Sequence, residues 1–205
     1  IKGQAVLFDS GIYAVIPADL DEKFVLAALD VAGAPAQVRK LAKPGDTVFI
    51  IGANGKSGLL CGLEAKNQVG PTGSIIGLVR KQNQVEQLES LHLFDSIIVE
   101  SATSSIEVYE KLSEVTNGEL ADLTINVVNT ENTEMTSILC TKELGTVYFF
   151  SMATSFTKAA LGAEGIGKDI TMIIGNGYTK NHANITLDIL KQNKQLFDLF
   201  MTRYA

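Results

Sequence analysis

Val48-Phe49-Ile50-Ile51-Gly52-Ala53-Asn54-Gly55-Lys56-Ser57-Gly58-Leu59-Leu60 is the stretch of the 205-residue sequence that decides the fold. An apolar run enters three glycines spaced G-x-x-G-x-x-G, and a second apolar run follows. A buried strand that turns through glycines into a helix forms a phosphate cradle, because no Cβ blocks a pyrophosphate and the helix N-terminus offers unpaired N–H groups. We therefore predict a dinucleotide site, with a purely structural turn as the alternative. Its candidate residues are Gly52, Asn54, Gly55, Lys56, Ser57 and Gly58.

The triplet Gly55-Lys56-Ser57 resembles the end of the phosphate-binding loop of nucleoside triphosphatases. That loop requires another glycine five residues earlier. Position 50 is an isoleucine of the apolar run, so a loop starting there would be too short to wrap a β-phosphate. The sequence argues against a triphosphatase.

Apolar runs bounded by turn residues alternate with segments of helical period along the chain, which is typical of parallel strands joined by crossover helices. Most of these runs are apolar throughout, as expected for strands buried on both faces. We therefore predict an α/β fold, a Rossmann doubly wound parallel sheet with helices on both faces. The predicted strands are Thr47–Gly52, Ser74–Val79, Ser96–Val99, Leu123–Val128, Thr146–Phe150 and Asp169–Ile174, and the predicted helices are Ser57–Lys66, Gln82–Leu91, Ser105–Thr116, Thr133–Leu139 and Asn184–Met201.

The first 46 residues do not follow this alternation. Gln4–Phe8 and Ile12–Ile16 predict a short hairpin, and Asp21–Lys43 predicts a helical stretch interrupted near Gly33-Ala34-Pro35. The turn Pro44-Gly45-Asp46 stands directly before the first buried strand. We therefore divide the chain into a leading part, 1–46, and a Rossmann domain, 47–205.

The end of the second predicted strand bears on the choice of cofactor. An acid there binds the ribose 2′-OH of NAD, whereas basic groups accept the 2′-phosphate of NADP. The sequence has Arg80 and Lys81 at this point and no carboxylate. These two residues favour NADP, and the alternative is that both are solvated charges at a helix start.

Three further strand ends meet the same edge if the sheet is parallel, because ligands collect outside the carboxyl ends of the strands. Small and amide side chains there leave room for ribose and nicotinamide and supply hydrogen bonds. Each is equally consistent with an ordinary loop, and their common position is the stronger argument. The candidate residues are Asn126, Val128, Asn129, Ser151, Met152, Asn176 and Gly177.

Composition and charge exclude several classes of protein. With 46% hydrophobic and 20% charged residues, the chain has enough apolar material for a packed core. A net charge of -6 argues against a nucleic-acid or anionic-membrane partner, since both require a basic surface. No apolar run reaches the roughly 18 residues of a membrane span. Cys61 and Cys140 fit no disulfide framework and no metal-ligand spacing, so we predict no metal site and a reducing, cytoplasmic location.

Two segments carry a resemblance to a known superfamily. Tyr13-Ala14-Val15-Ile16-Pro17-Ala18-Asp19-Leu20, followed by Lys43-Pro44-Gly45-Asp46-Thr47-Val48 and the glycine turn, resembles the passage from catalytic to cofactor domain in medium-chain dehydrogenases and reductases. The form of the turn is similar to that of the zinc-free quinone reductase branch. The resemblance implies that residues 1–46 are the edge of a GroES-like catalytic domain. It also implies a nicotinamide cofactor, with NAD favoured by the family.

Within that superfamily, Leu29–Gln37 taken with Phe49–Gly58 resembles amine dehydrogenases of bacterial lysine fermentation. The resemblance implies oxidative deamination of a small amino acid substrate, in which hydride leaves the carbon that bears an amino group and water releases ammonia. Two alternatives stay open: a zinc-independent quinone or enone reductase, and a dinucleotide-sensing module without chemistry. Catalytic residues stay unassigned, because most of the substrate pocket is expected in the missing catalytic domain.

Two expectations concern the protein as a whole. The first residue is Ile1 rather than methionine, which favours a chain that is part of a larger gene product. By analogy with the superfamily, the last predicted strand, Asp169–Ile174, is the sheet edge through which we expect a homodimer or a higher homo-oligomer to form.

Overall fold

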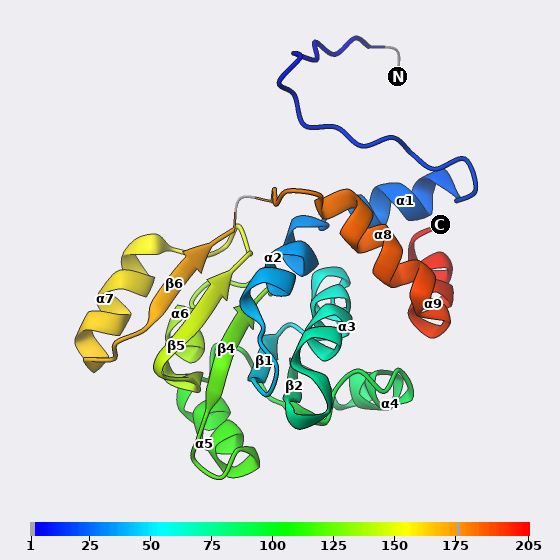
Figure 1. The fold of residues 1–205 in the computed structure, drawn as a ribbon. Helices are drawn as coiled ribbons and strands as arrows, with labels where there is room; N and C mark the ends of the chain where they lie inside the picture. The colour runs from blue at the N-terminus through cyan, green and yellow to red at the C-terminus, as the bar shows by residue number, and fades with distance from the viewer. Residues whose placement is uncertain (1–2, 176) are drawn as a thin grey trace.

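A computed structural model describes residues 3–175 and 177–205 of the chain, and a single parallel sheet lies at its centre (Figure 1). The strand order is β3-β2-β1-β4-β5-β6, and every neighbouring pair is parallel. This order confirms the predicted doubly wound fold, in which the chain moves outward from β1 in one direction and then from β4 in the other. The strands are β1 Thr47–Ile51, β2 Ser74–Val79, β3 Ser96–Val99, β4 Ala121–Asn126, β5 Thr141–Phe149 and β6 Thr171–Ile174.

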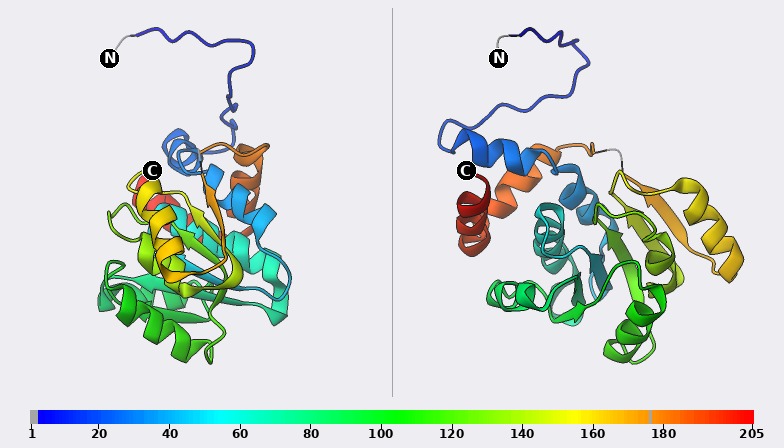
Figure 2. Two further views of the ribbon diagram at one scale, coloured as in Figure 1. Left: turned by 90° about the vertical axis from the view of Figure 1, so that its left-hand side faces the viewer. Right: turned by 180° about the vertical axis from the view of Figure 1, so that it is seen from behind.

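Helices cover both faces of the sheet, as the two further views in Figure 2 show. They are α1 Glu22–Leu29, α2 Gly33–Leu41, α3 Lys56–Val69, α4 Val85–Ser90, α5 Ser105–Val115, α6 Glu134–Cys140, α7 Phe156–Ile166, α8 His182–Gln192 and α9 Lys194–Tyr204, with short 3-10 turns η1 Gly70–Thr72 and η2 Gln82–Gln84.

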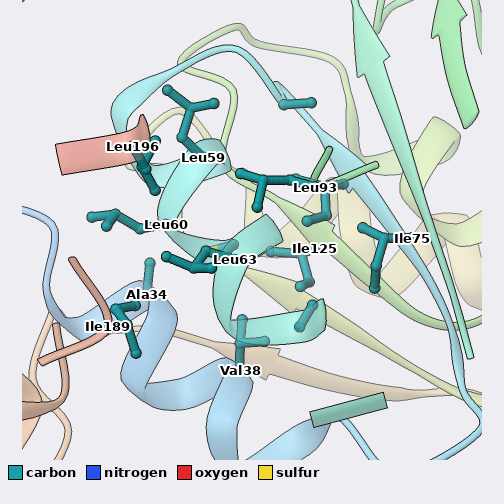
Figure 3. Close-up of a cluster of buried hydrophobic side chains, with 14 of the residues drawn as sticks. Ala34, Val38, Leu59, Leu60, Leu63, Ile75, Leu93, Ile125, Ile189 and Leu196 are labelled. Carbon is teal, nitrogen blue, oxygen red and sulfur yellow. The ribbon is translucent and has the colours of Figure 1, made fainter. Parts of the chain in front are cut away.

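The side chains of β1 alternate between two apolar cores. Val48 and Ile50 join the larger core, which contains residues of α1, α2, α3, α8 and α9. Phe49 and Ile51 join a second core under α5 and α6. All four side chains are fully buried, because successive residues of a strand point to opposite faces and both faces are covered. Figure 3 shows the larger core, where Ala34 and Val38 of α2 lie close to side chains of α3 and α8.

The register brings the carboxyl ends of the central strands to one edge. Ile51, the last residue of β1, pairs with Leu78 of β2 and with Asn126 of β4. The connections that leave these three strands therefore start side by side. Because the chain leaves β1 and β4 toward opposite sides of the sheet, the connections separate and leave a crevice between them.

The predicted hairpin in the leading part is wrong. Residues 3–21 form no strand, and the segment extends away from the rest of the chain (Figure 1). Its apolar side chains are exposed, among them Val6 at 84% and Val15 at 80%. An isolated two-stranded hairpin is marginal in water, and here no further layer covers an apolar face.

The interruption predicted near Gly33-Ala34-Pro35 is confirmed, because α1 ends at Leu29 and α2 begins at Gly33. Both helices pack on the Rossmann elements: α1 contacts α8 and α9, and α2 contacts α3 and α8. Phe24 of α1 is fully buried in the same core as β1. Residues 22–41 thus share the core of the sheet, and the division of the chain after residue 46 stays a prediction.

Two helix predictions differ from the structure. The predicted helix Asn184–Met201 is two helices, because Asn193 leaves the helical conformation and its Oδ1 accepts a hydrogen bond from the Leu196 N–H, which starts α9. Helix α7 was not predicted at all. Gly162 and Gly165 lower its helix propensity, and Ser155 at the N-cap and left-handed Gly167 at the C-cap define its ends instead.

None of the helices in the described ranges combines the length and the apolar character that crossing a membrane requires.

Candidate functional site

The glycine turn between β1 and α3 adopts a conformation that depends on glycine at two positions. Gly52 has φ +96°, and a Cβ there would lie 3.2 Å from the Cβ of Val128. A Cβ on Gly58 would overlap the carbonyl oxygen of Gly52 and lie 2.8 Å from the backbone of Ala53. The first glycine therefore allows the sharp turn, and the third allows α3 to pack against it.

Hydrogen bonds within the backbone hold most of this turn. The N–H groups of Gly52 and Ala53 both donate to the carbonyl of Leu78, at 3.2 and 3.1 Å, and the Gly55 N–H donates to the Gly52 carbonyl at 3.1 Å. The turn is thereby fixed to the end of β2.

The N-terminus of α3 follows the turn directly and has no capping side chain. Within residues 3–175 and 177–205, the backbone N–H groups of Lys56, Ser57 and Gly58 have no hydrogen-bond acceptor. These are the first-turn donors that a helix cannot satisfy internally, and the helix dipole adds partial positive charge at the same end. The arrangement suits an anion such as a pyrophosphate.

A pocket of about 460 Å³ opens beside the turn, at the carboxyl ends of β1, β2, β3 and β4. Six of the predicted site residues line it: Gly52, Asn54, Gly55, Arg80, Val128 and Asn129. They come from three connections that are far apart in the sequence. The structure therefore brings the glycine turn, the end of β2 and the end of β4 to one cavity, as the parallel-sheet argument requires.

The two basic residues after β2 differ in their placement. Arg80 is exposed and lines the pocket, whereas Lys81 is exposed and does not line it. The backbone N–H of Lys81 donates to Oε1 of Gln84 at 3.1 Å and begins the short η2 turn. In the part of the chain that the structure describes, neither side chain forms an ion pair. Arg80 is thus the cation at this end of the pocket.

The connection after β3 also lines the pocket, although none of its residues is among the predicted site residues. Its lining residues are Glu100, Ser101, Ala102 and Thr103, and Gln84 and Thr130 complete the wall nearby. The signal was available, because the argument about carboxyl ends applies to β3 as well as to the other strands. Two hydroxyl groups and one carboxylate add hydrogen-bonding capacity that a ribose could use.

The carboxylate of Glu100 accepts two hydrogen bonds from neighbouring groups of the protein. Its Oε2 accepts a hydrogen bond from Nζ of Lys111 at 2.9 Å, and its Oε1 accepts one from the Ser101 N–H at 2.8 Å. The Lys111 ammonium, and next the Ser101 N–H, hold the pKa of the Glu100 carboxyl below its usual value. The carboxylate therefore stays charged at neutral pH, with a lysine beside it to offset part of that charge.

Lys56, Ser57 and Gly58 do not line the pocket. Lys56 Nζ instead forms an ion pair with Asp30 at 2.7 Å and lies 5.6 Å from the centre of the Tyr204 ring. Their backbone N–H groups have no acceptor in the described chain, and their contact with a cofactor stays a prediction.

Asn126 is a buried structural residue in this fold. It is 1% exposed, and its Nδ2 donates to Oγ1 of Thr133 at 2.8 Å and to Oγ of Ser137 at 2.9 Å. Its Oδ1 accepts a hydrogen bond from the Val128 N–H at 3.3 Å. The amide therefore holds the connection after β4 through hydrogen bonds within the protein. Its contact with a cofactor stays a prediction.

The candidates after β5 and β6 lie apart from the pocket. Ser151, Met152 and Gly177 do not line it, and Met152 is 94% exposed. Asn176 lies outside the described residues. The structure thus gathers Gly52, Asn54, Gly55, Arg80, Val128 and Asn129 at the pocket, and leaves Ser151, Met152 and Gly177 outside it.

Comparison with known proteins identifies close relatives by sequence. Across its whole length the chain is 58% identical to an L-erythro-3,5-diaminohexanoate dehydrogenase of Acetoanaerobium sticklandii. It is 53% identical to a protein of the same name from Fusobacterium nucleatum. The chain spans 59% of the length of each of these curated relatives. No protein-family model matches the chain.

Solved structures support the fold. An alcohol dehydrogenase from Thermotoga maritima superposes with a TM-score of 0.66 over 88% of this chain and 51% of its own, at 20% identity. A quinone oxidoreductase from Pseudomonas syringae superposes with a TM-score of 0.60 over 92% of this chain and 56% of its own, also at 20% identity. The Rossmann sheet described above is the fold that these oxidoreductases share with the chain.

Proposed function

We propose that the chain is the cofactor-binding part of an oxidoreductase that deaminates L-erythro-3,5-diaminohexanoate to 5-amino-3-oxohexanoate and ammonia, with NAD or NADP as hydride acceptor and water as the source of the keto oxygen. The observation that carries the proposal is the 58% identity over the whole chain to a dehydrogenase named for this substrate. The chain spans 59% of that relative, so the remaining length is where we place most of the substrate pocket.

The residues present fit a nicotinamide dinucleotide. The turn lacks a Cβ at the points where one would meet Val128 and the Gly52 carbonyl, and the N–H groups of Lys56, Ser57 and Gly58 have no acceptor in the described chain, so a pyrophosphate is a suitable one. When bound, the cofactor supplies the acceptor for the hydride that leaves the substrate. This part of the protein holds the dinucleotide in place, so that the donor carbon and the acceptor meet in a fixed geometry.

Arg80 supports the acceptance of NADP. Arg80 lines the pocket and has no carboxylate partner in the described ranges, and a 2′-phosphate is a ligand to which arginine can donate two hydrogen bonds. Glu100 in the same wall opposes a phosphate, although Lys111 offsets part of its charge. We therefore propose that both NAD and NADP bind and that Arg80 determines the ratio of their affinities.

Replacing Arg80 tests this choice. We expect Arg80→Ala to weaken NADP binding about tenfold while NAD binding changes less than about twofold, because only NADP carries the 2′-phosphate. Lys81→Ala is the matched control, since Lys81 is a neighbouring cation that is also exposed but does not line the pocket. Titration of the purified protein with each dinucleotide measures both effects. Equal losses for NAD and NADP in Arg80→Ala would contradict the role of Arg80.

The activity is tested with the full-length protein. We expect reduction of NAD or NADP that depends on L-erythro-3,5-diaminohexanoate and releases one ammonia for each dinucleotide reduced. A quinone reductase is the second candidate, because a quinone oxidoreductase shares this fold. Oxidation of the reduced dinucleotide by a quinone, with no turnover of the diamino acid, would replace the proposed activity.

We also propose that two copies pair through β6. This strand is the end strand of the sheet, and Ile174 is 49% exposed on it. An unpaired edge with apolar side chains is a template for pairing with a second copy. Ile174→Lys is expected to shift the protein toward the monomer in light scattering coupled to gel filtration. An unchanged mass for this variant would place the interface elsewhere.

A further inference from the structure

Arg203, in the last turn of α9, contacts the glycine turn from 149 residues away in the sequence. Its Nη1 donates to the backbone carbonyl of Asn54 at 3.1 Å, and its Nη2 donates to Oδ1 of the same residue at 3.1 Å. Nη2 also donates to Oε1 of Gln87 in α4. One guanidinium group therefore joins the turn, α4 and α9.

Helix α9 is a firm support for this contact. Leu196 and Phe200 are fully buried, and the ring of Phe24 in α1 lies 4.5 Å from the ring of Phe197 and 6.5 Å from that of Phe200, between centres. The buried apolar face fixes the helix against the core, so the position of Arg203 is set before any ligand binds.

A second contact lies beside the first. Tyr204, the neighbour of Arg203, places its ring 5.6 Å from Nζ of Lys56, the first residue of α3. Lys56 also pairs with Asp30 at the end of α1. Two consecutive residues of α9 thus reach both ends of the segment that joins the turn to α3.

Among residues 52–55 of the described turn, Asn54 is the one whose N–H and carbonyl form no backbone–backbone hydrogen bond. The N–H groups of Gly52, Ala53 and Gly55 all have acceptors within the turn and β2. In the described part of the chain, the hydrogen bonds of Asn54 are those that it accepts from Arg203. Asn54 also lines the pocket. Because glycines flank this segment, its conformation depends on outside contacts more than that of an ordinary loop.

We propose that Arg203 is a positioning residue for dinucleotide binding: by holding Asn54 at two points, it keeps the glycine turn in the shape in which the N–H groups of Lys56, Ser57 and Gly58 can donate to the pyrophosphate. This proposal rests on the proposed function, since it requires that the turn binds a dinucleotide. The guanidinium acts through Asn54, which accepts hydrogen bonds from both of its terminal nitrogens, Nη1 and Nη2.

The test compares ligands with and without a pyrophosphate in the full-length protein. We expect Arg203→Ala to weaken the binding of NAD and of ADP-ribose about tenfold, and to change the binding of AMP less than about twofold, because AMP lacks the pyrophosphate. Arg203→Lys keeps the charge but not the two-point contact, so it should lose nearly as much as Arg203→Ala. Lys194→Ala removes a cation at the other end of α9 and is expected to bind all three ligands like the wild type.

Three results would overturn the proposal: full ADP-ribose affinity in Arg203→Ala, an equal loss for AMP and ADP-ribose, or full recovery in Arg203→Lys. If Arg203→Ala fails to fold, Asn54→Gly removes the Oδ1 acceptor from the other side and should lower ADP-ribose affinity about threefold, with AMP unchanged. Unchanged ADP-ribose binding in Asn54→Gly would also overturn it. Wild-type protein that binds no dinucleotide would instead contradict the proposed function.

Discussion

The carboxyl ends of β1 to β4 and those of β5 and β6 belong to one sheet, yet they differ in what they build. The first group, the pocket side, encloses a cavity of about 460 Å³. The second group, the outer side, leaves large apolar side chains in solvent, including Met152 at 94%, Phe156 at 61% and Ile174 at 49% exposed. Equivalent positions along parallel strands have therefore produced a walled site in one place and an open surface in the other.

The difference follows from topology. Between β1 and β4 the chain reverses its direction across the sheet, so the connections that leave these strands turn to opposite faces and a crevice remains between them. No such reversal occurs between β5 and β6, and α7 follows β5 on the outer side. A residue at the carboxyl end of a strand therefore lines a pocket here only where neighbouring connections leave toward opposite faces of the sheet.

The largest expected effect comes from a substitution at Gly58, in the first turn of α3 on the pocket side. Gly58→Ala should lower the free energy of unfolding by about 1–3 kcal/mol and abolish measurable dinucleotide binding, because the added Cβ overlaps the Gly52 carbonyl and crowds Ala53. Denaturant unfolding and dinucleotide titration measure the two losses.

The matched control lies in α7, the helix that joins β5 to β6. Gly165 is also within a helix, and a Cβ there meets no atom of the described chain within 4 Å. Gly165→Ala should therefore raise the free energy of unfolding by about 0.5–1 kcal/mol. Similar losses in the two variants would mean that the turn is no more tightly packed than the outer helix.

Replacing Asn126 should have an intermediate effect on stability. It tests whether this residue of the pocket side supports the fold or contacts the cofactor. Asn126→Ala should cost about 2 kcal/mol of unfolding free energy, since it removes buried hydrogen bonds to Thr133 and Ser137. We expect dinucleotide affinity to change less than about threefold, because the amide is used within the protein. A large loss of affinity at unchanged stability would instead make Asn126 a direct cofactor contact.

These contrasts show which parts of the site a sequence can reveal. The glycine turn and its strand are encoded within a dozen consecutive residues, so the sharp turn, the doubly wound parallel sheet and the placement of Arg80 at the pocket follow from local pattern and a general rule for parallel sheets. Glu100 to Thr103 follow from the same rule once it is applied to β3. Their polar side chains could have been found in the same way as those after β4.

Other features carry no local signal. Arg203 meets Asn54 across 149 residues, and nothing around either residue in the sequence predicts the contact. The exposure of Met152 depends on which connections stand beside it, and the break at Asn193 shows how one capping side chain divides an apolar stripe that reads as a single helix. Long-range packing decides each of these outcomes.

Replacing Met152, on the outer side, should have the smallest effect on stability and on ligand binding. Because 94% of its surface is exposed, Met152→Ser should change the free energy of unfolding by less than about 0.5 kcal/mol. ADP-ribose should bind this variant as it binds the wild type, since that ligand lacks the nicotinamide and the pocket beside the glycine turn does not include Met152. Denaturant unfolding and an ADP-ribose titration check both statements. A cost above about 1 kcal/mol would mean that this side chain is packed in solution, and the outer side would then be a built wall like that of the pocket.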